Sequence, residues 1–220
     1  MITDELRRRL SLPLADLVTT QDRQRVSDIV LEWDLPARDL EAVREWGLPK
    51  LRLFTPTHPV AAEPTLDPNL AGDHERRLVS RGQRLYELGF WGSRRDSCVV
   101  GVVPGDGRVL CLLPAPITVE DLPPALRPFH EGLHKPATSF FSSSLAQYLE
   151  TAWRWHAALA ILRSVTEPAI NGLQEEFDSH YDLLYGCVDL ILDAVRRIDP
   201  AVAAQEPHAT WVELIRANSL

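Results

Sequence analysis

Residues 96–113 read DSCVVGVVPGDGRVLCLL and hold two largely apolar runs, at 96–103 and 108–113, on either side of four turn residues. The turn at 104–107 is Pro-Gly-Asp-Gly, and an Asp-Gly pair between two apolar runs is a strong signal for a β-hairpin. A parallel pair would need a crossover connection of a dozen or more residues, for which this segment has no room. The segment therefore predicts two antiparallel strands.

Two further runs upstream extend this hairpin into an antiparallel meander. The stretches LRLF at 51–54 and RLYELGFWG at 84–92 are apolar or aromatic and are bounded by turn residues, as strands usually are. Between them, residues 56–68 contain four prolines in thirteen positions, which leaves little room for regular structure. We expect residues 56–80 to be a loop insertion within a single domain that spans residues 1–220.

Helices are predicted before and after the meander. Pro36 suits a first helical turn, and Gly47 ends a helix over about residues 36–46. The serines at 142–144 can cap a long helix that continues over 145–165. A second long helix, ended by Asp199-Pro200, and a docked terminal helix at 210–220 follow. The second helix carries an apolar stripe in steps of three and four, made of Phe177, Tyr181, Leu184, Val188, Ile191, Val195 and Ile198.

The charge of the chain is uneven and argues against nucleic acid as the main partner. The formal net charge is −8, and binding to phosphates usually needs clustered basic residues. Residues 167–199 alone hold eight acids and two arginines. Four of these acids follow a line beside the apolar stripe, which predicts a solvated flank and a candidate surface for a basic partner. These four are Asp178, Asp182, Asp189 and Asp193.

Residues 130–134 read HEGLH and fit the H-E-x-x-H pattern of zinc metallopeptidases. There, His130 and His134 would bind the metal from one helix while Glu131 acts as general base. Pro128, Gly132 and Pro136 leave little room for that helix, and a third ligand would have to be Glu150 or His156. The other interpretation is a proline-bounded loop with surface histidines. We also find no serine-hydrolase elbow, P-loop or dinucleotide-binding string, and we expect no catalytic residues and no cofactor.

The cysteines and the hydropathy favour the cytoplasm. Cys98, Cys111 and Cys187 are odd in number, widely spaced and set among apolar residues, so we expect buried reduced thiols rather than a disulfide framework. The apolar runs are far shorter than the ~20 residues that span a bilayer, and the N-terminal residues lack the apolar centre of a signal peptide. We therefore expect no membrane partner.

Several short motifs occur in an order that resembles the SUKH superfamily, within it the fourth branch, which is common among immunity proteins of bacterial toxin systems. The residues that carry the resemblance are Trp46-Gly47-Leu48-Pro49, Leu88-Gly89, Asp106-Gly107-Arg108-Val109, Ser142-Ser143-Ser144-Leu145, Ile198-Asp199-Pro200-Ala201 and Trp211. The Pro-rich segment and the HEGLH string lie outside it.

The resemblance implies an α+β fold, with a bent, mainly antiparallel sheet flanked by N-terminal and long C-terminal helices. It also implies a non-catalytic protein that binds and neutralises a cognate toxin, often a nuclease or a deaminase. Because such nucleases grip phosphates and are usually basic, an acidic inhibitor gains association rate from electrostatic steering. The alternatives are a zinc-dependent hydrolase that uses the HEGLH string and a regulatory adaptor of the same fold.

Overall fold

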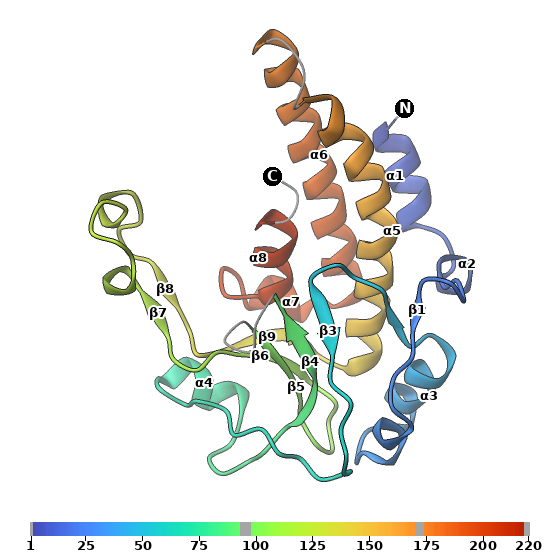
Figure 1. Cartoon of the computed structure of the whole chain (residues 1–220), viewed down its shortest axis with the longest axis vertical. Helices are drawn as coiled ribbons and strands as arrows, with labels where there is room; N and C mark the ends of the chain where they lie inside the picture. The colour runs from blue at the N-terminus through green and yellow to red at the C-terminus, as the bar shows by residue number, and fades with distance from the viewer. Residues whose placement is uncertain (1, 93–97, 170–173, 218–220) are drawn as a thin grey trace.

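The predicted hairpin forms the centre of a five-stranded antiparallel sheet. The computed structural model describes residues 2–92, 98–169 and 174–217, and for residues 165–169 and 174–181 it describes the backbone alone. The strand order is β3-β4-β5-β6-β9, and shifts of register in β4 and β6 add local bends to the sheet (Figure 1). The strands are β3 (Phe54–Pro56), β4 (Tyr86–Trp91), β5 (Val99–Val102), β6 (Val109–Leu112) and β9 (Thr138–Ser142).

The sheet confirms the hairpin, corrects the strand predicted at 51–54 and contains one strand that was not predicted. Val99 pairs with Leu112 and Val102 with Val109, so β5 and β6 are antiparallel as expected. The strand predicted at 51–54 begins only at Phe54, because residues 51–54 turn and the Phe54 amide donates to the Leu51 carbonyl. Strand β9 was not predicted, since its sequence precedes a run of serines that indicated a helix cap.

The remaining elements flank this sheet as helices and short paired strands. The two long helices are close to the predicted ranges, and the predicted helix over 36–46 is confirmed as α3. The elements are α1 (Ile2–Leu10), α2 (Leu14–Leu17), β1 (Arg23–Gln24), η1 (Asp28–Glu32), α3 (Ala37–Glu45), β2 (Leu48–Pro49), α4 (Asp73–Leu78), β7 (Ile117–Thr118), η2 (Val119–Asp121), η3 (Arg127–Phe129), β8 (His134–Lys135), α5 (Leu145–Ala169), α6 (Gln174–Ile198), α7 (Ala201–Ala204) and α8 (Thr210–Ala217).

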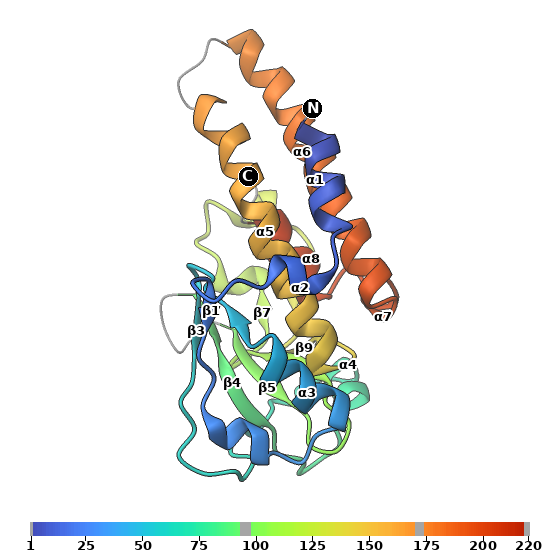
Figure 2. The ribbon, with the colours of Figure 1, turned by 90° about the vertical axis from the view of Figure 1, so that its right-hand side faces the viewer.

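Helices α5 and α6 form an antiparallel pair that rises away from the sheet, with α1 packed against both (Figure 2). The first half of α5 covers the sheet, and α8 closes the same core. An aromatic cluster joins these parts: the Trp91 indole of β4 donates to the Tyr148 hydroxyl of α5 at 3.1 Å, and Trp211 of α8 packs against both rings. The fold is therefore α+β, as predicted.

The beginning of α5 is held by residues from distant parts of the chain. Ser144 is the cap, because its hydroxyl accepts from the Gln147 amide at 3.2 Å. Asp39 of α3, which is 1% exposed, accepts from the Ala146 amide at 2.8 Å. Asp199, also 1% exposed, accepts from the Ser143 amide at 2.6 Å and from its hydroxyl at 2.8 Å. Two buried carboxylates thus support the N-terminus of this helix, where they complement its dipole.

Residues 56–80 contain more structure than the predicted loop. Helix α4 lies within this segment and packs against β9. Its Glu75 side chain is 2% exposed and accepts from the amides of Gly72 at 2.9 Å and Ala137 at 3.1 Å. The second half of the segment is therefore attached to the sheet, which local proline content did not reveal.

The cysteines also differ from expectation. The structure joins Cys98, directly before β5, to Cys111 of β6 in a disulfide, whereas we had expected reduced thiols. Cys187 is free and buried in α6, and its burial raises the pKa of the thiol.

Within the described residues, no helix combines the length and apolar character needed to cross a membrane.

Candidate functional site

The outer face of α6 carries the acidic line that the sequence predicted. Asp182, Asp189 and Asp193 are exposed. On the opposite side, the described residues of the apolar stripe are buried except for Ile198, which is half-buried. Asp178 lies on the same helix, but its side chain is outside the part that the structure describes. The predicted separation of a buried stripe and a solvated flank is therefore confirmed for the described half of the helix.

Tyr185 lies within this acidic face and was missed by the sequence analysis. It is 52% exposed, three residues after Asp182 and four before Asp189, a spacing that places all three side chains together on a helix. That spacing was the signal that could have identified it. Tyrosine is enriched where proteins bind one another, because it offers a large apolar ring with a polar end. We call Asp182, Tyr185, Asp189 and Asp193 the α6 face.

The charge on the α6 face is not uniform. Asp193 pairs with Arg196 at 3.1 Å, and Arg196 also contacts Glu206 at 2.9 Å. The Glu206 carboxylate raises the pKa of Arg196, and Asp193 raises it further by a smaller amount. Among the described residues, neither Asp182 nor Asp189 forms an ion pair. The end of the face near Asp182 and Asp189 therefore offers the less compensated negative charge.

The HEGLH string does not form the helix that a metallopeptidase requires. His130 follows the short turn η3, Gly132 has φ +81°, and His134 begins strand β8. The two histidines therefore lack the one-turn helical spacing that would direct both to one metal ion. In the described residues, no group of three His, Cys, Asp or Glu side chains is arranged to hold a metal. The zinc-hydrolase alternative loses the geometry on which it depended.

Instead, His134 joins two other histidines beside a cavity of about 270 Å³. The ring centroid of His208 lies 6.3 Å from that of His134 and 5.4 Å from that of His74. Burial lowers the pKa of His74, and the nearby charge of His208 lowers it further. The cavity is lined by His74, Arg77, Leu78, Ala204, Gln205, Glu206 and His208.

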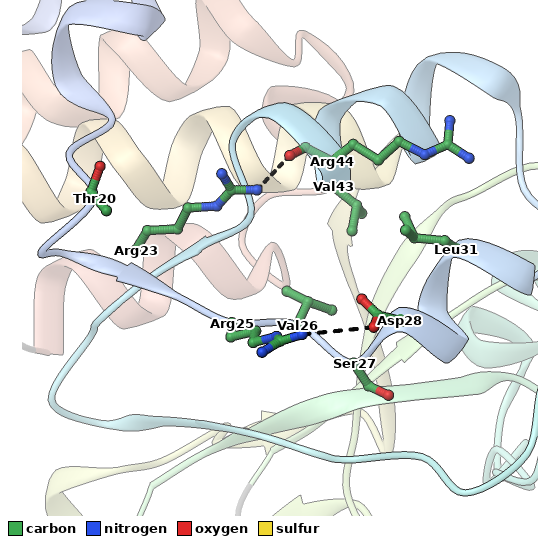
Figure 3. Close-up of a pocket in the computed structure, with 9 residues that line it drawn as sticks. All are labelled: Thr20, Arg23, Arg25, Val26, Ser27, Asp28, Leu31, Val43 and Arg44. Atoms are coloured by element: carbon green, nitrogen blue, oxygen red, sulfur yellow. Dashed lines mark hydrogen bonds and ion pairs between the residues drawn. The ribbon is translucent and has the colours of Figure 1, made fainter.

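A second cavity, of about 410 Å³, opens between β1, η1 and α3 (Figure 3). Arg23 donates to the carbonyl oxygen of Arg44, and Arg25 pairs with Asp28 at 3.8 Å. The lining residues are Thr20, Arg23, Arg25, Val26, Ser27, Asp28, Leu31, Val43 and Arg44.

Comparison with known proteins identifies one family. No curated protein and no solved structure matches the chain. The model of one family, described as SUKH-4 immunity protein, matches residues 14–217, from the start of α2 to the end of α8. Because this match covers nearly the whole chain, the protein belongs to the SUKH-4 immunity protein family.

Proposed function

We propose that this protein is a cytoplasmic immunity protein that binds a cognate basic toxin, such as a nuclease or a deaminase, and neutralises it without catalysis of its own. The observation that carries the proposal is the family match over residues 14–217. The acidic α6 face supports it, because negative charge attracts a basic partner and blocks a groove that otherwise holds phosphates. Membranes and nucleic acids are not among the proposed partners.

The decisive experiment uses the gene beside that of this protein, which we expect to encode the toxin. Co-expression of the two is expected to rescue growth, and a catalytically inactivated toxin is expected to co-purify with the full chain. If growth is not rescued and the two proteins do not co-purify, the proposal is wrong. In that case the adaptor alternative gains support, since an adaptor of this fold would bind a different protein.

The α6 face is tested by reversing its charge. The double variant Asp182→Lys/Asp189→Lys is expected to lower the association rate by about tenfold or more at low salt, because steering depends on ionic strength. A matched control is Glu41→Lys/Glu45→Lys, which makes the same change of net charge at exposed positions of α3. Equal effects of the two double variants would show that only bulk charge matters and that the α6 face is not the contact.

Asp178 and Asp193 belong to the same proposed surface but are less informative positions. Asp193 is held by Arg196, so its substitution changes an ion pair as well as the surface. Tyr185→Ala is the better third variant, and we expect it to increase the dissociation rate, since short-range contacts determine how long a complex lasts.

A further inference from the structure

Residues 114–136 leave the sheet between β6 and β9 as a projecting arm (Figure 1). Within it, β7 and β8 pair in antiparallel fashion, with Ile117 opposite Lys135 and Thr118 opposite His134. All residues from 123 to 132 are exposed, including the HEGLH histidine at 130. We call this segment the 114–136 arm.

The tip of the arm exposes large apolar side chains. Phe129 is 80% exposed and Leu126, three residues earlier in the same turn, is 46% exposed. Of the six large hydrophobic side chains that are exposed in the described part of the chain, three belong to this arm, Ile117 being the third. An isolated exposed apolar residue is ordinary, but an adjacent phenylalanine and leucine at the end of a projection indicate a contact with another molecule.

The arm is held in shape by its own hydrogen bonds. Arg127 donates to the carbonyls of Leu122 at 3.0 Å and Glu120 at 2.8 Å. Asp121 accepts from the Thr118 amide at 2.7 Å. At the base, Lys135 pairs with Glu213 of α8 at 2.5 Å, with both side chains about one-third exposed. An arm ordered before binding loses little conformational freedom on binding, so its apolar contacts count almost fully toward affinity.

The charge around the tip favours a basic partner over a second copy of the chain. Glu120, Asp121 and Glu131 are exposed near the tip, while the guanidinium of Arg127 faces backbone carbonyls of the arm itself. A second copy would bring the same acidic groups and the same net charge of −8 to the contact. A basic toxin with an apolar pocket bordered by Lys or Arg is complementary to both features.

Resting on the proposed function, we infer that the 114–136 arm inserts Phe129 and Leu126 into an apolar pocket of the toxin. The arm supplies the short-range contact that holds the complex together, and the α6 face supplies the long-range attraction. The two surfaces therefore differ in what they mainly control: the arm mainly controls dissociation, and the aspartates of the α6 face mainly control association.

The test measures binding of the full chain to the catalytically inactivated toxin of the neighbouring gene by surface plasmon resonance. Phe129→Ala is expected to weaken binding by about 30-fold, mainly through faster dissociation, which corresponds to about 2 kcal/mol at 1.4 kcal/mol per tenfold. Leu126→Ala is expected to weaken it by about fivefold. The matched control is Val60→Ala, since Val60 is 96% exposed in a different loop.

The possible outcomes separate this inference from the proposed function. Unchanged thermal unfolding of the Phe129 variant is expected because its side chain is mostly exposed, so weaker binding would reflect a lost contact. If the wild-type chain binds and Phe129→Ala binds within about threefold of it, the arm is not the contact and the inference fails alone. If the wild-type chain does not bind the toxin, the proposed function fails as well. A wild-type dimer in sedimentation that Phe129→Ala dissociates would assign the arm to a second copy and overturn the inference.

Discussion

Gly107, in the turn of the central hairpin, offers a sharp test of how the sheet is connected to the helices. Its φ is +74°, and a Cβ added there would lie 1.9 Å from Oδ2 of Asp39, whose Oδ1 supports the N-terminus of α5. Gly107→Ala therefore has two costs: the left-handed backbone and the displacement of a buried carboxylate. Gly105→Ala is the matched control, because Gly105 has φ +82° in the same turn but its nearest neighbour, Asp34 Oδ2, is 3.9 Å away.

The magnitudes follow from these two contributions. The left-handed conformation costs an alanine about 1–2 kcal/mol, which is all that Gly105→Ala should lose. Loss of a side-chain acceptor at a helix N-terminus adds about 1–2 kcal/mol for Gly107→Ala, or about 3 kcal/mol in total. For a chain of 220 residues, this corresponds to a fall in Tm of roughly 6–12 °C for Gly107→Ala and roughly 3–6 °C for Gly105→Ala.

Urea unfolding of the two variants, alone and combined with Asp39→Ala, measures the effect. In the Asp39→Ala background the clash no longer exists, so the cost of Gly107→Ala is expected to fall to that of Gly105→Ala, with a coupling of about 1–2 kcal/mol. The reasoning is refuted if Gly107→Ala costs no more than Gly105→Ala in the wild-type chain, or if its cost is the same in both backgrounds.

Three further predictions test other contacts. In urea unfolding, Asp199→Ala is expected to lower the free energy of unfolding by about 3 kcal/mol, because two charge-assisted hydrogen bonds to Ser143 are lost. The control Asp193→Ala, at an exposed position, should change the free energy of unfolding by less than about 0.5 kcal/mol. Glu75→Ala should cost about 2 kcal/mol by leaving two amides without their acceptor, and faster amide exchange at Ala137 would show the reason. The pKa of His74 is lower in the folded chain than in the unfolded chain, so the contribution of His74 to stability is present at high pH and is lost as the pH falls through the pKa of the unfolded chain. Wild type should therefore lose stability relative to His74→Asn between about pH 7.5 and about 5.5. Equal slopes of the urea midpoint against pH for the two proteins would contradict this.

The features predicted correctly are those encoded by neighbouring residues. The hairpin around residues 104–107, the cap at Ser144 and the amphipathic pattern of α6 each depend on turn chemistry or periodicity within a few positions. Strand β9 was missed because its partner β6 lies on the other side of the 114–136 arm, so no local pattern marks the pairing. The Cys98–Cys111 bond was missed although it joins the two sides of the predicted hairpin, because the odd number and wide spacing of the cysteines indicated reduced thiols.

The motifs that carry the family resemblance turn out to contact one another. Asp199 accepts from Ser143, and the Trp211 indole donates to the Ser142 hydroxyl at 3.2 Å. Gly107 lies against Asp39, which is outside these motifs but accepts from the Ala146 amide, directly after the motif at 142–145. These residues hold the fold together, which explains why the motifs indicate the family and the architecture but not the surface that meets a toxin. The exposed Phe129 and Tyr185 belong to no such motif, and their exposure depended on where the rest of the chain packs.

The two ends of the 114–136 arm emerge at neighbouring strands, with Leu112 of β6 directly opposite Thr138 of β9. The sheet therefore closes beneath the arm whatever the arm contains, and the free energy of closing a loop changes only slowly with its length. If the arm is the toxin contact that we propose, an exchange of this one segment would give the same scaffold a new specificity. In a contest between toxins and their inhibitors, such a position lets recognition change rapidly while the residues that maintain folding stay fixed.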